Sequence, residues 1–229
     1  MSKDQRHPLV MRLADFWGLW YQYRYYILLA ALMIMLILPA FTHGNESIIW
    51  SFSRTLVLLA CINVLRDINQ NIVLVVIIGL VATGSEWLSV FDLDSRYSHI
   101  LGFLLFGFFV VMISYEVFKE IIVSKKIDMH IIVGAFCGFM LIGIIASLIF
   151  YFLHLDNPES FSNVAPKFGG VEDLFYFSFI TILTIGYGDI APLTDEARSL
   201  ALFFGLIGQF YLVVIMAVLV GKFIGSSEV

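Results

Sequence analysis

The sequence predicts an all-α membrane protein. Of its 229 residues, 60% are hydrophobic and only 14% are charged, whereas soluble domains carry about 45–50% apolar and about 25% charged residues. The mean hydropathy is +0.94. Several long runs contain almost no charge, and a helix needs about 20 mainly apolar residues to cross a membrane. This composition argues against a soluble enzyme and, more strongly, against a disordered chain, which needs low hydrophobicity and high net charge.

Six runs of this kind predict six membrane-spanning helices. In chain order they cover residues 25–41, 48–65, 72–90, 97–115, 131–153 and 199–221. Arg54 and Glu86 are the charged residues within these runs. Because a charge inside a membrane usually finds a partner, we expect Arg54 to pair with Glu86. The alternative is that Arg54 extends to the lipid headgroups.

A seventh apolar segment, residues 171–183, differs from the others in length. Its 13 residues are too few to cross a membrane. Glu172 and Asp173 stand at its start, where acidic side chains favour a helix N-terminus. We predict a half-helix that enters and leaves the membrane on one side. The irregular backbone after it requires protein or a water-filled pore around it.

The distribution of lysine and arginine predicts the orientation in the membrane. With the N-terminus in the cytoplasm, nine of these residues outside the apolar runs fall inside and three fall outside. Six spans then return the C-terminus to the cytoplasm. The net charge of −5 provides no basic surface for nucleic acid, so no nucleic-acid partner is expected.

The string TIGYGD, residues 184–189, carries the chemistry that the sequence suggests. Dehydrating K⁺ in a membrane is costly unless oxygens replace its water, and backbone carbonyls can do so when they all face one axis. Such a ribbon needs left-handed dihedrals at alternate residues, which Gly186 and Gly188 adopt without steric cost. The Thr184 hydroxyl adds a further oxygen. Four copies around an axis would form stacked oxygen cages, whereas one copy forms none.

TIGYGD resembles the selectivity filter of bacterial pore-loop potassium channels. The resemblance runs through YFSFITILTIGYGDIAP and ARSLALFFGLIGQFYLVVIMAVLVG, from about residue 131 to 225. It implies a homotetramer in the plasma (inner) membrane that passes K⁺, with membrane lipid around it and no cofactor apart from the permeant ion. The implied K⁺ sites are the carbonyls of Thr184, Ile185, Gly186, Tyr187 and Gly188.

Other residues take roles from their distance to this filter. In the family an aspartate after the filter bonds to an aromatic side chain of the pore helix, and here Asp189 and Tyr176 occupy these positions. Since a carboxylate beside the filter needs a donor, we expect the Tyr176 hydroxyl to bond Asp189. Gly208 stands where the family has a hinge glycine, with a packing role as the alternative. One face of the last span either lines the central cavity or packs in the core; it comprises Leu212, Met216 and Val220.

These assignments divide the chain into three regions. Residues 1–24 form a cytoplasmic or interfacial segment that mixes arginines with aromatic residues. Residues 25–128 form a four-helix peripheral membrane domain, and residues 129–229 form the pore domain. A voltage sensor needs Arg or Lys at every third residue of its fourth span. Residues 97–115 have neither, so gating by a conventional voltage sensor is not expected.

Other functions remain open at this point. A weakly selective cation channel would use the same loop with fewer intact ion sites. A K⁺ transporter subunit usually holds four filter-like loops in one chain, whereas this chain holds one. A sensory protein with a vestigial pore is disfavoured by the intact GYGD. A membrane enzyme has no support, because neither HExxH nor GxSxG occurs.

Overall fold

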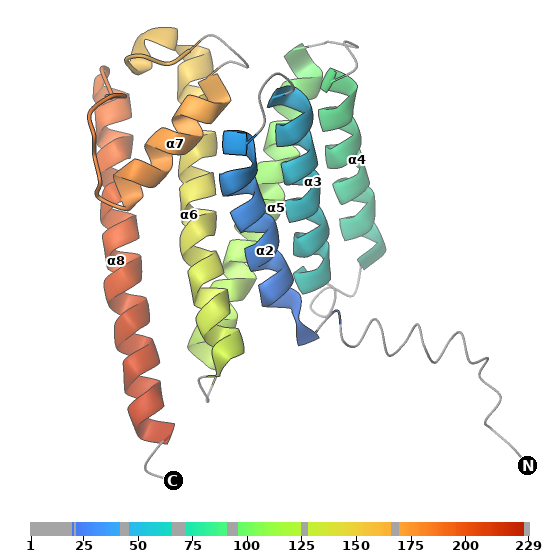
Figure 1. Ribbon diagram of the computed structural model, residues 1–229, viewed down its shortest axis with the longest axis vertical. Helices are drawn as coiled ribbons and strands as arrows, with labels where there is room; N and C mark the ends of the chain where they lie inside the picture. Colours follow the sequence, from blue (N-terminus) through green and yellow to red (C-terminus); the bar gives the residue numbers. More distant parts are fainter. Residues whose placement is uncertain are drawn as a thin grey trace, which may run out of the picture.

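The computed structural model describes residues 20, 22–41, 46–65, 72–90, 96–124, 128–165 and 170–226. The predicted interfacial segment, residues 1–24, lies outside this range except for residues 20 and 22–24. The described residues form a bundle of long helices with one short, inclined helix, α7, at one end (Figure 1). Helices make up the regular structure throughout this part of the chain, in the following order: α2 (Arg24–Ile37), η1 (Leu38–Phe41), α3 (Glu46–Leu65), α4 (Ile72–Val90), α5 (Arg96–Val123), α6 (Met129–Asp156), η2 (Pro158–Ser160), α7 (Val171–Ile182) and α8 (Asp195–Ser226).

Four of these helices are long and apolar enough to cross a membrane, which supports a multi-pass membrane protein. They cover Ile48–Leu65, Ile100–Val123, Met129–Asp156 and Asp195–Lys222. Two further apolar segments within the described residues, Arg24–Ile37 and Val75–Ser85, are shorter. The first and third predicted spans therefore remain predictions. The helices α5 and α8 also run beyond the predicted spans at 97–115 and 199–221. Backbone hydrogen bonding continues past the apolar residues, and in α5 the extension carries Glu116 and Glu120.

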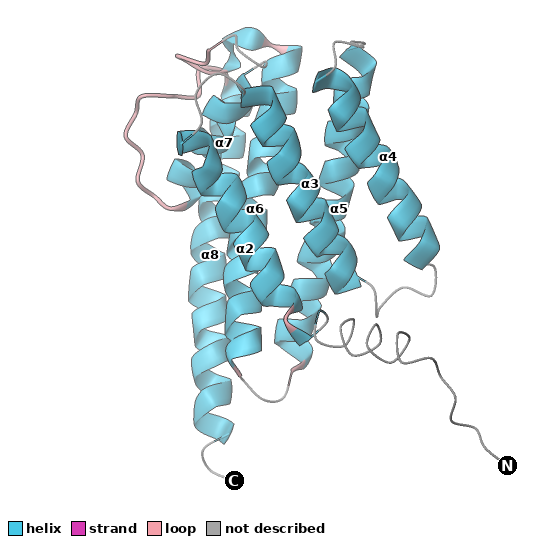
Figure 2. Cartoon of the chain, turned by 45° about the vertical axis from the view of Figure 1, so that its right-hand side comes forward, coloured by secondary structure: helices cyan, strands magenta, loops and turns pink. Residues whose placement is uncertain are grey.

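The helix α6 occupies the centre of the packing. It contacts α2, α5, α7 and α8, and α5 in turn contacts α3 and α4. The helices α2 and α5 therefore pack directly against α6. Figure 2 shows the connection between α7 and α8 as a pink loop that stands out from the bundle.

Two glycines on α6 permit this close packing. A Cβ atom at Gly138 would lie 2.5 Å from the Tyr211 hydroxyl of α8, and one at Gly143 would lie 2.7 Å from the Phe179 ring of α7. These aromatic side chains occupy the space that a larger residue on α6 would take. The two glycines thus allow α7 and α8 to pack closely against α6.

Candidate functional site

A short helix is present at residues 171–183, as expected: α7 has 12 residues. It begins after Gly170, whose φ of 76° places it in the left-handed region that glycine tolerates. Glu172 and Asp173 occupy its first turn, as the sequence suggested. Asp173 Oδ2 also accepts a hydrogen bond of 2.6 Å from the backbone N–H of Ala165, which ties the start of α7 to the preceding loop.

The end of α7 supports the segment that follows it. The carbonyl oxygen of Ile180 accepts hydrogen bonds from the backbone N–H groups of Ile185 and Gly186, at 2.9 Å and 3.2 Å. A helix otherwise leaves its last carbonyls without partners. The first residues of TIGYGD are therefore fastened to the carboxyl end of the half-helix.

Residues 184–188, which we call the filter segment, have an alternating backbone. Thr184, Gly186 and Gly188 have φ values of 57°, 56° and 77°, whereas Ile185 and Tyr187 between them do not have positive φ. This is the alternation that a ribbon of co-directed carbonyls needs. For threonine the left-handed region costs about 1–2 kcal/mol, so the surrounding contacts must hold Thr184 in place.

The side chains of the filter segment are not covered by their own chain. Ile185 is 47% exposed and Tyr187 is 72% exposed, and Leu183 just before them is 45% exposed. Side chains of this size that stay uncovered together mark a surface for a partner or a membrane.

The bond expected between Tyr176 and Asp189 is present. The Tyr176 hydroxyl donates to Asp189 Oδ2 at 2.8 Å. The Asp189 carbonyl also accepts a 2.7 Å hydrogen bond from the Asn163 side chain. The bond from Tyr176 lowers the pKa of the Asp189 carboxyl below its ordinary value and raises the pKa of the Tyr176 hydroxyl. These directions show that the bond favours the ionised carboxylate and the neutral phenol.

Gly208 lies where α8 crosses the end of α7. A Cβ atom at this position would be 3.0 Å from both Cβ and the carbonyl oxygen of Ile182. This close approach supports the packing alternative for Gly208. Leu212 and Val220 are 41% and 50% exposed on α8. The side chain of Met216 lies outside the described residues, so the predicted cavity face remains a prediction.

Of the predicted pair of Arg54 and Glu86, the structure describes the side chain of Arg54 alone. Arg54 is 7% exposed, and its guanidinium carbon lies 4.5 Å from the centroid of the Phe103 ring on α5. This burial disagrees with the alternative in which Arg54 extends to the headgroups. The side chain of Glu86 falls outside the described part of the chain, so the pairing itself stays a prediction.

Two polar contacts that the sequence did not indicate join α7 to α3 and α8 to α5. The Trp50 indole N–H on α3 donates to Glu172 on α7. The Lys222 ammonium on α8 donates to backbone carbonyls at the end of α5. Residue spacing could not reveal them, because each contact joins positions about a hundred residues apart. For the second contact, the sequence signal is Lys222, which directly follows the last apolar run.

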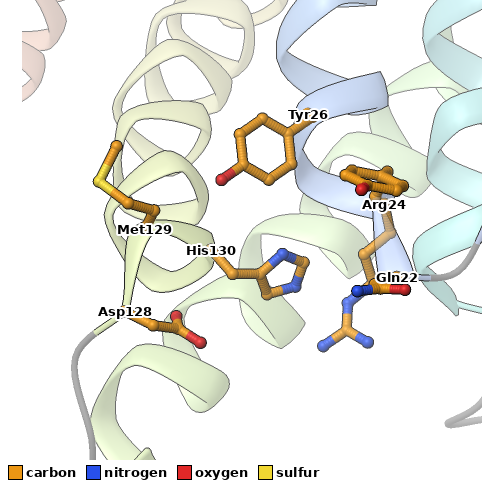
Figure 3. A pocket seen from close by; sticks show the side chains of 7 residues that line it. Gln22, Arg24, Tyr26, Asp128, Met129 and His130 are labelled. Atoms are coloured by element: carbon orange, nitrogen blue, oxygen red, sulfur yellow. The ribbon is translucent and has the colours of Figure 1, made fainter.

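A cavity of about 600 Å³ opens near the start of α2 and α6 (Figure 3). Its lining includes Arg24, Asp128 and His130. The Arg24 guanidinium donates to both carboxylate oxygens of Glu120, at 2.5 Å and 2.6 Å. Asp128 accepts from the backbone N–H of Ile131 and so caps α6. Two of the charged groups at this cavity thus already have partners within the chain.

The comparison with known families identifies the region around the filter segment. Residues 138–224 match the family model described as "Ion channel". This range contains most of α6, all of α7, the filter segment and most of α8. The match indicates a channel rather than an enzyme.

Curated potassium channels from distant organisms are similar to part of the chain. "Two pore potassium channel c" of Oryza sativa subsp. japonica is 34% identical over 71 residues, which is 31% of this chain and 16% of that protein. "Potassium voltage-gated channel subfamily KQT member 3" of Homo sapiens is 34% identical over 82 residues, 34% of this chain and 9% of that protein.

A third relative, "Hyperpolarization-activated voltage-gated potassium channel" of Methanocaldococcus jannaschii, is 45% identical over 42 residues, 18% of this chain and 20% of that protein. The chain therefore spans between 9% and 20% of the length of these three relatives. No solved structure matches the chain. The matches support a relationship to the potassium channel family, carried by the ion channel region.

Proposed function

We propose, from the premise that residues 138–224 form an ion channel domain, that the protein is a homotetrameric potassium channel. The carbonyl oxygens of residues 184–188 would coordinate dehydrated K⁺ as it passes down its gradient, with no cofactor besides the permeant ion. The observation that carries this proposal is the positive φ at Thr184, Gly186 and Gly188, directly after a half-helix. In such a ribbon successive carbonyls can face one axis.

The exposed surface of α8 supports assembly from several chains. Only 24% of the most apolar stretch of α8 is buried within the chain, whereas 78% of the most apolar stretch of α6 is buried. A groove of about 620 Å³ runs beside the filter segment, from Arg198 past Leu206 to Gln209 on α8 and to Thr184. Irregular backbone cannot face lipid directly, because its polar groups would lack partners. Other copies of the chain, rather than lipid alone, are the natural cover for this groove.

The membrane arrangement follows from the same proposal. All six predicted spans cross the plasma membrane, with α2 and α4 as the first and third. The filter segment lies toward the outside, and the end of the bundle that holds Glu120 and Lys222 lies inside with both termini. Residues 25–128 form the peripheral domain and residues 129–229 the pore domain, with gating by a route other than a conventional voltage sensor. Arg54 and Glu86 would form an ion pair within the peripheral domain.

Rubidium flux into liposomes tests this function. Vesicles that contain the purified protein and are loaded with KCl should accumulate tracer rubidium, and vesicles loaded with NaCl should accumulate little. Gly186→Asp should abolish uptake, because a side chain on the ribbon would block it. Equal uptake with both salts would indicate a weakly selective cation channel. No uptake by the protein alone would leave the transporter subunit, and a detergent complex smaller than a tetramer would contradict the assembly.

A further inference from the structure

The first turn of α7 is held by a tryptophan from the peripheral helices. Trp50 on α3 is 6% exposed, and its indole N–H donates a hydrogen bond to Glu172 Oε1. The indole ring also meets the Phe175 ring edge-on, with centroids 5.2 Å apart and an interplanar angle of 75°. One side chain of α3 therefore contacts two residues in the first turns of the half-helix.

This contact has both strength and direction. A buried indole N–H needs an acceptor, and a carboxylate acceptor gives a stronger hydrogen bond than a neutral group. The edge-on ring contact restricts the tilt of α7 relative to α3. Together they fix the position of the start of α7 rather than merely fill space beside it.

The helix α7 connects this contact to the filter segment. One turn after Glu172, Tyr176 donates to Asp189 beyond the filter segment. Near its end, the Ile180 carbonyl accepts from the N–H groups of Ile185 and Gly186. A shift of α7 at its start would therefore move supports on both sides of the filter segment.

The helix α3 is well placed to transmit a movement of the peripheral domain. It packs against α2, α4 and α5. The bond from Trp50 to Glu172 joins α3 directly to α7. A displacement of α3 would therefore act on the first turn of α7 through this side chain, in addition to the contacts that α6 makes with α7.

We propose that Trp50 is a positioning residue for ion selectivity, and that the peripheral helices act on the filter through its bond to Glu172. The inference rests on the proposed channel function. It gives the first four helices a role that does not depend on a voltage sensor, because it needs only a displacement of α3. Trp50 touches neither the ion nor the filter segment and acts through α7.

The chain offers a matched control for removing this bond. Trp50→Phe removes the indole N–H and keeps an aromatic ring against Phe175. Trp87→Phe removes another indole bond, 3.1 Å to the neutral Thr55 Oγ1, which joins α4 to α3 without reaching α7. Glu172→Gln keeps a carbonyl acceptor for Trp50, whereas Glu172→Leu removes the acceptor from the other side.

The readout is the ratio of rubidium to sodium uptake in liposomes, with tetramer content measured by size-exclusion chromatography. We expect Trp50→Phe and Glu172→Leu each to lower this ratio by about tenfold, which corresponds to about 1.4 kcal/mol, while the tetramer persists. Glu172→Gln and Trp87→Phe should stay close to wild type. The double variant Trp50→Phe/Glu172→Leu should be no worse than either single variant, because both remove one interaction.

The possible results distinguish a failure of the Trp50 positioning role from a failure of the proposed channel function. If wild-type protein is selective and Trp50→Phe behaves like Trp87→Phe, the positioning role is wrong and the channel stands. Additive losses in the double variant would also overturn it. If Trp50→Phe fails to assemble, the ratio measured for Glu172→Leu decides. If wild-type protein shows no selective uptake, the channel proposal fails and the positioning role fails with it.

Discussion

The Tyr176 hydroxyl and the Asp189 carboxylate are 2.8 Å apart and share a hydrogen bond across the filter segment. Tyr176 belongs to α7, before the segment, and Asp189 follows it. The bond therefore closes a loop around residues 184–188. The backbone of Thr184 is strained by its positive φ, and a closed loop is one way to hold it.

Tyr176→Phe removes this bond without changing the ring. We expect rubidium uptake to become less selective against sodium, because the segment can relax when its far end is released. Asp189→Asn keeps an acceptor oxygen and should have a smaller effect. Tyr115→Phe is a control on α5, where the side chain is 66% exposed. A Tyr176→Phe protein with unchanged selectivity would show that the bond is dispensable.

The same bond predicts a pH dependence with two limits. The bond lowers the pKa of Asp189 from an ordinary value of 3.8, so its stabilisation is present above 3.8 and is lost as the pH falls through the lowered value. It raises the pKa of Tyr176 from 10.0, so that contribution is present below 10.0 and is lost as the pH rises through the raised value. We expect selectivity to be constant between these limits.

External pH can be varied in the liposome assay to check this. In Tyr176→Phe this acid limit should be absent, because the bond that Asp189 accepts from Tyr176 is already missing at every pH. An acid limit that is identical in wild-type protein and in Tyr176→Phe would contradict the assignment to this pair.

The filter segment was the most predictable part of the molecule. The positive φ values of Gly186 and Gly188 follow from the two glycines, which adopt the left-handed region without steric cost, whereas the positive φ of Thr184 was not predicted. The half-helix was predictable from its length and from Glu172 and Asp173. These are local properties, and local sequence determines them.

The contacts between distant helices were not predictable in the same way. Trp50 and Glu172 are separated by 122 positions, and their pairing depends on how α3 and α7 pack. The role of Gly208 was open between a hinge and a packing contact, because both require a small residue. Only the position of Ile182 distinguishes them. The composition predicted a membrane protein. Which residues become neighbours, as Trp50 and Glu172 do, depends instead on how the apolar faces of the helices pack.

Gly186→Ala tests whether the filter segment needs a residue that tolerates positive φ at this position, separately from whether a side chain there would collide with its neighbours. A Cβ atom at Gly186 would meet nothing within 4 Å in the chain, but φ is +56° there. We expect a destabilisation of the filter segment of about 1–2 kcal/mol per chain and a loss of selective rubidium uptake. Gly84→Ala on α4 is the control, since its Cβ also meets nothing and its φ is ordinary. Equal behaviour of the two variants would argue against the alternating ribbon.

Gly208→Ala tests the crossing of α7 and α8. The added methyl would lie 3.0 Å from the Ile182 backbone, so one helix must shift, at a cost of about 1–3 kcal/mol. Thermal unfolding in detergent should show this as a lower midpoint temperature. Gly221→Ala lies on the same helix with nothing within 4 Å and should be neutral or slightly stabilising. If Gly208→Ala changes flux but not stability, the hinge role would be favoured instead.

Lys222 provides the last test, at the other end of α8. Its ammonium group donates to the carbonyls of Ile121, Ile122 and Ser124 at 2.9 Å, 2.8 Å and 2.5 Å. These carbonyls lie at the end of α5, where a helix has free acceptors and a negative dipole end. Because the bonds are charged and partly buried, Lys222→Met should lower the free energy of unfolding by about 1–3 kcal/mol.

The matched control is Lys119→Met, which removes a half-exposed lysine whose 3.4 Å pair with Glu116 should contribute about 0–1 kcal/mol. Chemical denaturation in detergent measures both variants. The same variants in the liposome assay show whether α8 must stay fastened to α5 for the pore to conduct. An increased rubidium uptake in Lys222→Met alone would mean that this contact holds the inner end closed. An unchanged uptake with lower stability would make it a structural cap only.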